Sequence, residues 1–375
     1  KVGHSAPGSI PAQCTLMLRR SVHSCCLHAL RRSVPTLLLA LFCFPAAVLI
    51  FNTNVYRQPN RGGSAALQSE DLFERRNSSW DKENFHRLME ARMAFRRRAL
   101  KEGCSRYGLD IPGNDSLHKP NPWEFLINKK YHIIWCNVFK AASSSWMYNF
   151  NILAGYKPSF LQHTNQVPLQ LARQKYPRPT LEQLNTALND SIAFLIVRHP
   201  FERLLSAYRD KLQYALANTY HQKLGFQIIE KYRPGAKKIR FSNVPRWPTF
   251  VEFTRFLLDE IKEGNELDMH WTPITQFCSP CQVDFDIIMK FDTLNEDQRY
   301  FIDIAGLEKV IRVEWKNPAK GPITNNVIAK YYKQLTSTQI LQLYNFYRYD
   351  FELFGYSVEK YLTEAKPDSM ATPSL

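Results

Sequence analysis

Two stretches of the chain decide its fold: residues 131–146, YHIIWCNVFKAASSSW, and residues 191–209, SIAFLIVRHPFERLLSAYR. Each begins with an apolar run typical of a buried strand and continues into a stretch with helical spacing, to Leu153 in the first and to Leu212 in the second. Pro200 stands where proline is favoured, at the first position of the second helix. A third apolar stretch follows at residues 283–294. Repeated strand-loop-helix units predict an α/β fold with a central parallel sheet.

The loop after the first predicted strand has the composition of a phosphate-binding cradle. Small residues at a helix N-terminus let backbone N–H groups approach an anion closely, serine hydroxyls add donors, and Lys140 supplies a positive charge. The loop is not a Walker A motif, because G-x-x-x-x-G-K-[ST] is missing and the loop has no glycine. Taken alone, an ordinary serine N-cap beside a surface lysine is the more common meaning of such a loop.

The second stretch places Arg198 at the carboxyl end of a predicted strand, where a guanidinium can bind a phosphate through two hydrogen bonds. Ser206 follows eight residues later, about 12 Å away along a continuous helix. A helix start with solvent-facing arginines is again the more common meaning when this stretch is considered alone. The interpretation therefore depends on the combination of the two stretches.

In combination, the two stretches resemble the paired signatures with which sulfotransferases bind 3′-phosphoadenylyl sulfate (PAPS): a strand-loop-helix unit, then R-x-P-x-x-R-x-x-S-x-Y. More narrowly, the chain resembles the carbohydrate sulfotransferase family that includes the chondroitin 4-O-, dermatan 4-O-, GalNAc 4-O- and HNK-1 sulfotransferases, over about residues 104–362. Further matching segments are Cys104-Ser-Arg-Tyr-Gly, His270-Trp271, Cys278-Ser-Pro-Cys281, Phe285-Asp286, Lys290-Phe-Asp-Thr-Leu-Asn-Glu-Asp297 and Asp350-Phe-Glu-Leu-Phe-Gly-Tyr356.

The resemblance implies a single PAPS-binding sulfotransferase domain over residues 104–365, with a P-loop-like cradle for the 5′-phosphosulfate and a second loop for the 3′-phosphate. It implies that Lys140 contacts the bridging and transferring oxygens, and that Arg198 and Ser206 bind the 3′-phosphate. PAPS enters as a co-substrate, and the transfer needs no metal. The implied donor-binding residues are Phe139, Lys140, Ala141, Ala142, Ser143, Ser144 and Ser145 in the first loop, and Arg198, His199, Pro200, Phe201, Glu202, Arg203, Leu204, Leu205 and Ser206 in the second.

The chain departs from the family pattern in both loops. Phe139 stands where proline is usual before the lysine, and Ser143-Ser144-Ser145 replaces the frequent Cys-Thr-Asn. His199 occupies a position that is usually acidic, which puts in doubt how the 3′-phosphate loop is braced. The residues on which the prediction depends are all present: Lys140, Arg198 and Ser206.

Sulfuryl transfer to a sugar also needs a side chain that accepts the proton of the attacking hydroxyl, and histidine is the common choice. His270, in the segment Asp-Met-His-Trp, is the first candidate for this base, and His163 is the second. A lone histidine is more often structural, so both assignments are hypotheses.

Residues 34–51, VPTLLLALFCFPAAVLIF, form an uncharged apolar stretch that would reach about 27 Å as a helix. Because it has no polar stripe, it predicts a transmembrane signal-anchor, with a buried core helix or a cleaved signal peptide as the alternatives. Arg31 and Arg32 precede it, which favours a cytoplasmic N-terminus. The expected order is a cytoplasmic tail (1–33), the anchor, a charged helical stem (52–103), the domain (104–365) and a flexible tail (366–375). Met17 is a candidate start, which would make residues 1–16 translated upstream sequence.

The formal net charge of +15 implies an acidic partner, such as nucleic acid, an anionic membrane surface, a polysaccharide or a nucleotide. Residues 1–51 carry five Lys and Arg and no Asp or Glu, so the remainder keeps +10. The three arginines at 96–98 could bind an anionic polymer, although a solvated helix face is the more frequent meaning of such a run. A hydrophobic share of 45% suffices for a packed core, to which the aromatic-rich residues 331–356 are expected to contribute helices.

Four cysteines follow the predicted anchor, and an even set in an oxidising lumen predicts two disulfides, whose pairing the sequence leaves open. A zinc site is the less favoured alternative, because no second cysteine pair has metal-ligand spacing. A thioredoxin-like redox pair would have to start a helix of a βαβ unit, which the downstream position does not offer. Three N-x-S/T sequons also follow the anchor and predict glycosylation. The cysteines are Cys104, Cys136, Cys278 and Cys281, and the sequons begin at Asn77, Asn114 and Asn189.

These features together favour a single-pass type II glycoprotein of the Golgi membrane whose lumenal domain transfers a sulfuryl group from PAPS to a carbohydrate hydroxyl. The expected acceptor is a glycosaminoglycan or another glycan, with position 4 of GalNAc in chondroitin or dermatan favoured; nucleic acid is not expected, and the oligomeric state stays open. The main alternative is a non-catalytic glycosaminoglycan-binding membrane glycoprotein, which would not need both phosphate loops. A lumenal kinase should show a Walker A motif or acidic metal ligands near the cradle, and the sequence shows neither.

Overall fold

A computed structural model describes residues 65–233, 235, 245–312 and 325–370 of the chain. The contacts divide the chain into a unit of residues 1–78 and a unit of residues 79–375, and the second unit contains the sheet. Among the described residues, no helix is long and apolar enough to cross a membrane. The predicted signal-anchor at residues 34–51 and the predicted cytoplasmic tail lie outside the described residues.

The second unit is built around a four-stranded sheet in the order β1-β2-β3-β4. β2 (Ile133–Cys136), β3 (Ile192–Val197) and β4 (Ile287–Lys290) are parallel, as predicted. β1 (Phe125–Asn128) pairs antiparallel with β2, because the four residues that join them are enough for a turn and too few for a crossover. The prediction of a parallel sheet is therefore wrong at this edge, and the sheet is mixed.

Bulky side chains fill the space above the middle of the sheet. Trp135 of β2 and Phe194 of β3 are partners in the register and stack with ring centroids 6.1 Å apart. Trp146, from the helix after β2, and Phe301, from the helix after β4, lie 4.8 and 4.4 Å from the Phe194 ring. All four side chains are fully buried, so both helices pack on the central strand β3.

The crossover from β2 to β3 contains four helices joined by short loops. α3 (Ser143–Leu153) ends at the residue predicted from the sequence and is followed by α4 (Pro158–His163), α5 (Pro168–Lys175) and α6 (Leu181–Leu188). The helix predicted after β3 is α7 (Pro200–Tyr208), which continues as the π-helix η2 (Arg209–Gln213). A π-helical turn inside a helix often marks a functional site, because it moves side chains out of the regular spacing.

A second apolar cluster, made by helices alone, adjoins the sheet cluster. It contains α7 and the aromatic-rich C-terminal helices, so the prediction of a helical core at residues 331–356 is confirmed. Its other helices are α8 (Tyr220–Tyr232), α9 (Phe250–Glu263), α12 (Asn325–Tyr332), α13 (Ser337–Phe346), α14 (Arg348–Phe354) and α15 (Glu359–Thr363). α10 (Ile274–Cys278) and α11 (Leu294–Ile304) belong to the sheet cluster, and the remaining elements are η1 (Pro122–Glu124), η4 (Phe291–Thr293) and η5 (Asp368–Met370).

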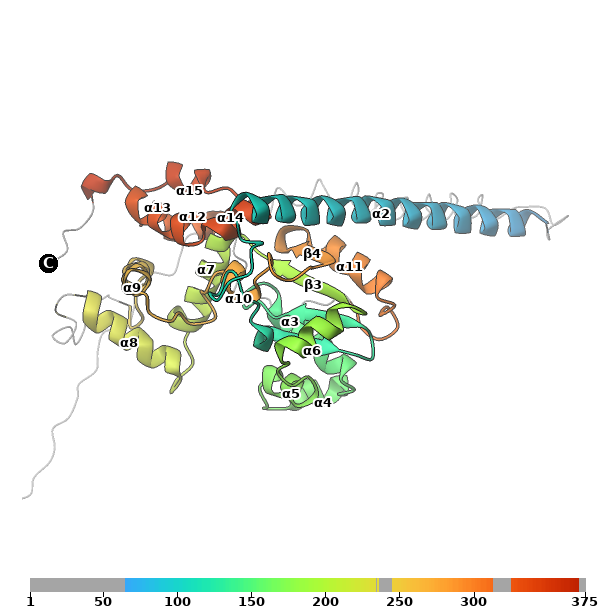
Figure 1. Cartoon of the computed structure of the whole chain (residues 1–375), viewed down its shortest axis with the longest axis horizontal. Helices are drawn as coiled ribbons and strands as arrows, with labels where there is room; N and C mark the ends of the chain where they lie inside the picture. The colour runs from blue at the N-terminus through green and yellow to red at the C-terminus, as the bar shows by residue number, and fades with distance from the viewer. Residues whose placement is uncertain (1–64, 234, 236–244, 313–324, 371–375) are drawn as a thin grey trace, which may run out of the picture. The chain divides into compact units, whose positions relative to one another are not determined.

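The predicted helical stem corresponds to α2 (Ala65–Arg106), a single helix that extends beyond the predicted stem end at residue 103 (Figure 1). From residue 79 on, α2 belongs to the compact unit, whereas the predicted domain begins at 104. Met89 and Met93 are fully buried in the sheet cluster, and Arg96 binds the buried carboxylate of Asp297 at 2.6 Å. Charged neighbours hide this apolar stripe in the sequence. The run at 96–98 is not wholly a solvated face, because Arg96 is nearly buried, whereas Arg97 and Arg98 are exposed and Arg97 donates to Asp286 O.

Two disulfides tie α10 and the segment after it to the sheet and to α2. Cys136, the last residue of β2, pairs with Cys278, and Cys104 of α2 pairs with Cys281; the Cα atoms are 6.1 and 5.5 Å apart. The prediction of two disulfides among these four cysteines is confirmed. Cys278 and Cys281 have different partners, so they do not form a redox pair with each other, and their sulfurs are not free to bind zinc.

We expect the double substitution Cys136→Ala and Cys278→Ala to lower the free energy of unfolding by about 2–5 kcal/mol, because the lost disulfide joins residues 142 apart in sequence. Chemical denaturation of the purified full chain measures this change. The pair Cys104 and Cys281, 177 residues apart, is the matched comparison and should show a loss of similar size. An unchanged denaturation midpoint in either double variant would contradict the structural role.

Candidate functional site

Basic side chains follow the carboxyl ends of the three parallel strands. Lys140 comes four residues after β2, Arg198 directly after β3, and Lys290 is the last residue of β4. The structure brings the first two together, because Arg198 Nη1 donates to Lys140 O at 3.3 Å. Lys290 lies with its ammonium 4.7 Å from the ring of Tyr356 and was not among the predicted site residues, although its place at the end of a predicted strand was a usable signal. This edge of a parallel sheet is where α/β proteins bind ligands.

The loop between β2 and α3 has an unusual backbone. Lys140 and Ala142 have φ of 68° and 58°, in the left-handed region that residues other than glycine seldom adopt, while Ala141 between them does not. Such alternation turns successive N–H groups toward one concave side, which is a known geometry for binding anions. Ala142 is also the N-cap of α3 and offers no side-chain hydrogen bond to the helix. The backbone strain is the kind that folds retain at functional sites.

The side chain of Arg203 holds this loop in place through hydrogen bonds to backbone carbonyls. Its side chain is fully buried, and it donates through Nε to Phe139 O at 3.0 Å and through Nη2 to Thr272 O at 2.6 Å. Arg203 was among the predicted donor-binding residues; two of its nitrogens bind backbone carbonyls, and Nη1 has no hydrogen-bond partner among the described residues. Phe201, Leu204 and Leu205 of the same predicted set are fully buried in the helical cluster, so their side chains serve packing.

The Lys140 side chain is half-buried and contacts η2. Its ammonium lies 2.5 Å from Asp210 Oδ2, and Lys211 lies 3.4 Å from the same oxygen. Burial lowers the pKa of Lys140, and the Asp210 carboxylate opposes this shift. The sequence analysis missed Asp210 and Lys211; the signal that could have found them is their position directly after the R-x-P-x-x-R-x-x-S-x-Y segment.

Arg198 is a buried cation with incompletely used donors. Its side chain is 7% exposed, its contacts with Glu202 Oε2 are 3.4 and 3.5 Å long, and it stacks 4.1 Å above the Phe291 ring. Hydrogen bonds between such charged groups are usually 2.7–2.9 Å, shorter than the contacts with Glu202. The guanidinium can therefore bind another anion more closely than it binds Glu202. Ser206 is half-buried on α7, the helix that also carries Glu202.

His199 caps α7 instead of facing an anion. Its Nδ1 accepts from the Phe201 N–H at 3.2 Å, and its Nε2 lies 3.1 Å from Ser357 O, to which it can donate. Burial lowers the pKa of His199 to about 4, so the ring is neutral under physiological conditions. The histidine therefore braces the loop through hydrogen bonds where the family pattern has an acidic residue.

Of the two histidines predicted as the base, the structure brings one to the cradle. The ring of His270 lies 4.8 Å from the ring of Phe139, the residue before Lys140. Burial lowers the pKa of His270, and so do the charges of Lys211 and Lys140. His163 is exposed at the end of α4, where its Nδ1 contacts Ser159 O of the same helix at 2.7 Å. No contact in the described part of the chain joins His163 to the cradle.

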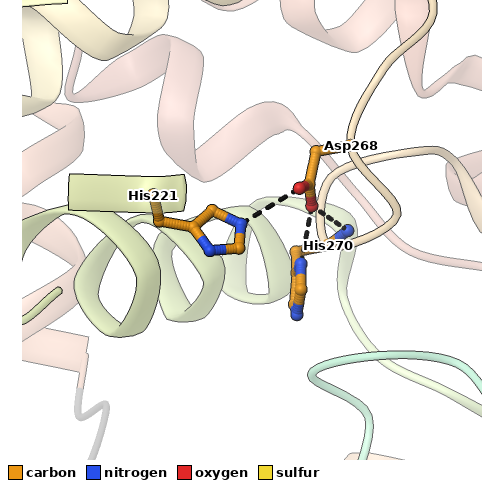
Figure 2. Close-up of side chains that lie close together, drawn as sticks. All are labelled: His221, Asp268 and His270. Carbon is orange, nitrogen blue, oxygen red and sulfur yellow. Dashed lines mark hydrogen bonds and ion pairs between the residues drawn. The ribbon is translucent and has the colours of Figure 1, made fainter. Parts of the chain in front are cut away.

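His270 is also part of the one group of possible metal ligands found among the described residues. His221, Asp268 and His270 have donor atoms within 4.8 Å of one another. Figure 2 shows that both rings point at the Asp268 carboxylate, and the contacts have the lengths of hydrogen bonds, 3.0 and 2.6 Å. Neither His221 nor Asp268 was singled out from the sequence, where they lie 47 residues apart and carry no motif.

Comparison with known proteins identifies the family. The model of the sulfotransferase family matches residues 123–357. Carbohydrate sulfotransferase 9 of Homo sapiens is 32% identical over 286 residues, covering 75% of this chain and 63% of that protein. Carbohydrate sulfotransferase 14 of Danio rerio is 31% identical over 245 residues, covering 64% of each chain. Carbohydrate sulfotransferase 11 of Mus musculus is 28% identical over 251 residues, covering 65% of this chain and 70% of that protein.

The chain thus spans less than two thirds of the length of the first of these relatives. No solved structure matches it significantly. The family match extends over more than half of the chain and includes the loop of Lys140, the loop of Arg198 and the loop of His270. The chain belongs to the sulfotransferase family, and the curated relatives named above are carbohydrate sulfotransferases.

Proposed function

We propose that this chain transfers a sulfuryl group from PAPS to a hydroxyl group of a carbohydrate acceptor. The observation that carries the proposal is the left-handed backbone at Lys140 and Ala142, which turns an uncapped helix end into an anion-binding concavity beside the half-buried Lys140 and the buried Arg198. A chain that only bound glycosaminoglycans would have no need of this strained loop. Membership of the sulfotransferase family supports the same reaction.

The residues present fit PAPS as the donor. The loop from Phe139 to Ser145 would hold the 5′-phosphosulfate through backbone N–H groups and serine hydroxyls. Arg198 and Ser206 would hold the 3′-phosphate, and the long contacts of Arg198 with Glu202 leave its donors available for that role. The donor set of lysine, arginine, hydroxyls and backbone amides suits a polyanion and requires no metal ion.

PAPS supplies the activated sulfuryl group, whose bond to a phosphate oxygen breaks while a bond to the sugar oxygen forms. Lys140 neutralises the negative charge that develops on that phosphate oxygen, and its buried surroundings strengthen the interaction. To do so, Lys140 must leave Asp210; Lys211, 3.4 Å from the same carboxylate, keeps Asp210 paired. Nε2 of His270 accepts the proton of the attacking hydroxyl, for which the lowered pKa keeps the imidazole neutral near pH 7.

For the acceptor, we propose position 4 of GalNAc in chondroitin or dermatan. The resemblance to the chondroitin and dermatan 4-O-sulfotransferases supports this choice, and the positive charge of the chain suits an anionic glycan. For the location, we propose a Golgi membrane with the domain in the lumen, where the oxidising compartment would permit the two disulfides to form.

Incubation of the purified full chain with radiolabelled PAPS and a panel of desulfated glycosaminoglycans tests the reaction and the acceptor together. Disaccharide analysis then names the sugar and the hydroxyl that receive the label. Retention on immobilised adenosine 3′,5′-bisphosphate, competed by PAPS and not by ATP, tests donor recognition separately. A chain that binds glycosaminoglycans but neither retains the bisphosphate nor transfers label would be the non-catalytic binder.

We expect Arg198→Ala and Ser206→Ala each to weaken PAPS binding by about 1–3 kcal/mol, because each removes a hydrogen-bond donor from the 3′-phosphate. The arginine should matter more, since its hydrogen bonds are charge-assisted. Calorimetry on folded protein measures both affinities. Arg178→Ala, which removes an exposed arginine next to Trp123, is the matched control and should bind PAPS as the wild type does. Wild-type affinity in both site variants would refute the assignment.

Lys140→Ala should depress kcat by about 10²–10³-fold and raise the KM for PAPS much less, because the ammonium acts mainly on charge that develops in the transition state. Lys140→Arg should restore only part of the rate, since a planar guanidinium cannot replace a compact ammonium aimed at one oxygen. Steady-state kinetics at varied PAPS separate the two constants. Lys129→Ala, at an exposed lysine, serves as control. A change confined to KM would show that Lys140 only binds the donor.

If the domain lies in the lumen, Asn114 and Asn189, both exposed, should carry glycans in cells, and so should Asn77, which lies in α2. Enzymatic deglycosylation should then increase the gel mobility of the full chain, and each Asn→Gln change should remove part of the shift. Asn185→Gln, at an exposed asparagine outside any sequon, should change nothing. A protease-accessible domain in sealed vesicles would contradict the proposed orientation.

A further inference from the structure

A half-buried carboxylate, Asp268, lies between two histidines that come from different elements. His221 is the second residue of α8, whereas Asp268 and His270 belong to the loop between α9 and α10. His221 Nε2 lies 3.0 Å from Asp268 Oδ2, and His270 Nδ1 lies 2.6 Å from Asp268 Oδ1 (Figure 2). The backbone N–H of His270 also donates to Oδ1, at 2.9 Å. Both carboxylate oxygens are therefore engaged.

This arrangement determines which nitrogen of His270 can accept a proton. An ionised carboxylate only accepts hydrogen bonds, so the contact with Asp268 requires the proton of the neutral ring to sit on Nδ1. Although burial favours the protonated acid, the hydrogen bonds from His221 and His270 hold the pKa of Asp268 well below its usual range. The carboxylate thus stays an acceptor, and Nε2 of His270 is left unprotonated.

Nε2 of His270 is the ring nitrogen that is left to accept a proton, because Nδ1 is engaged by Asp268. No hydrogen bond in the described residues uses this atom, and it is not among their buried polar atoms without a partner. The ring packs 4.8 Å from the Phe139 ring, so the tautomer is set next to the loop that carries Lys140. The ring of His221 lies 6.1 Å from the buried ring of Trp271, and this contact helps to hold His221 in place.

We propose that Asp268 and His221 are positioning residues for the sulfuryl-transfer reaction: Asp268 fixes the tautomer and direction of the His270 ring, and His221 holds the second oxygen of that carboxylate. The inference rests on the proposed function, in which the proton of the sugar hydroxyl moves to Nε2 of His270 as the sugar oxygen bonds to sulfur. Asp268 then stabilises the imidazolium that forms. A carboxylate that orients a general base without itself taking the proton is an established arrangement in other enzymes.

The charged groups around His270 determine the pH dependence. Asp268, on the same loop, favours the imidazolium, whereas Lys140 from the cradle and Lys211 from η2 disfavour it. His221 of α8 contacts Asp268 from the other side. The pKa of His270 is lowered overall, so kcat should fall only as pH drops below about 6.5, the ordinary value for histidine. Loss of the Asp268 charge should move this acid limb to still lower pH.

The test uses the full chain with PAPS and the best acceptor of the panel. Asp268→Asn should lower kcat by about 10²-fold or more, within the range for general-base catalysis, and shift the acid limb of the kcat profile downward. Retention on immobilised adenosine 3′,5′-bisphosphate and the KM for PAPS should stay within about two-fold, since the donor site is not altered. Asp115→Asn changes an exposed carboxylate that contacts His118 at 2.8 Å, and this matched control should keep the wild-type rate and profile.

Two variants of His221 separate hydrogen bonding from packing. His221→Gln keeps a donor for Asp268 and should retain more of kcat than His221→Phe, which keeps the ring shape without the donor. The reverse order, or a wild-type rate and acid limb in Asp268→Asn, would overturn the proposal while leaving the proposed function intact. Activity abolished by a chelator and restored by Zn²⁺ would make the three residues a metal site and also overturn it. Wild-type protein that transfers no label at all would refute the proposed function itself.

Discussion

The arrangement of the site depends on one buried cation, Arg203. Arg203 is fully removed from water and donates through Nε and Nη2 to the carbonyls of Phe139 and Thr272, while its Nη1 has no hydrogen-bond partner among the described residues. Burial lowers its pKa, and Tyr347 and Asp350 oppose that shift. The side chain thereby joins the cradle, α7 and the loop of His270, which are far apart in sequence. If any of these three segments moved, a buried hydrogen bond would be lost.

The C-terminal helices complete the same network from the other side. Asp350 is fully buried and accepts hydrogen bonds from the N–H groups of Ile274 and Thr275, at the start of α10. The hydroxyl of Tyr347 donates to Trp271 O at 2.5 Å. The disulfide of Cys278 then ties the end of α10 to β2. The loop that carries Asp268 and His270 is therefore held by Arg203, Tyr347, Asp350 and a disulfide, which leaves it little freedom. In the proposed reaction, a base held in this way needs no rearrangement.

The electrostatics of the site follow from this rigidity. Lys140 is half-buried and Arg198 is buried, and each is paired with an acidic side chain on the helix that follows β3, Asp210 and Glu202. The pairing makes their burial tolerable without a ligand, because an unpaired buried charge is very costly. It also leaves both cations able to exchange a side-chain carboxylate for a more highly charged ligand. In the proposed function, Asp210 and Glu202 therefore belong to the donor site even though they would repel the donor itself.

The sequence by itself determined the local elements and the residues that have a recognisable neighbourhood. The apolar runs predicted β2, β3 and the stretch that contains β4, because buried parallel strands need continuous hydrophobic side chains. Lys140, Arg198 and the four disulfide cysteines could be named for the same reason, since each stands in a short segment with a typical pattern. The mixed edge of the sheet and the inclusion of α2 in the domain were not predicted, since a short strand and a stripe of four apolar residues among arginines give weak signals.

What only the tertiary structure decided is which distant side chains meet. His221 and Asp268 lie 47 residues apart, and Arg203 bonds to carbonyls 64 and 69 residues away. No periodicity or motif links such positions, because their contact depends on how two apolar clusters pack against each other. The sequence therefore offered two histidines as candidate bases, His270 first and His163 second. The fold brought His270 against Phe139 and left His163 on an exposed helix end. The sequence shows which side chains are histidines, but the surroundings that distinguish one histidine from another depend on tertiary packing.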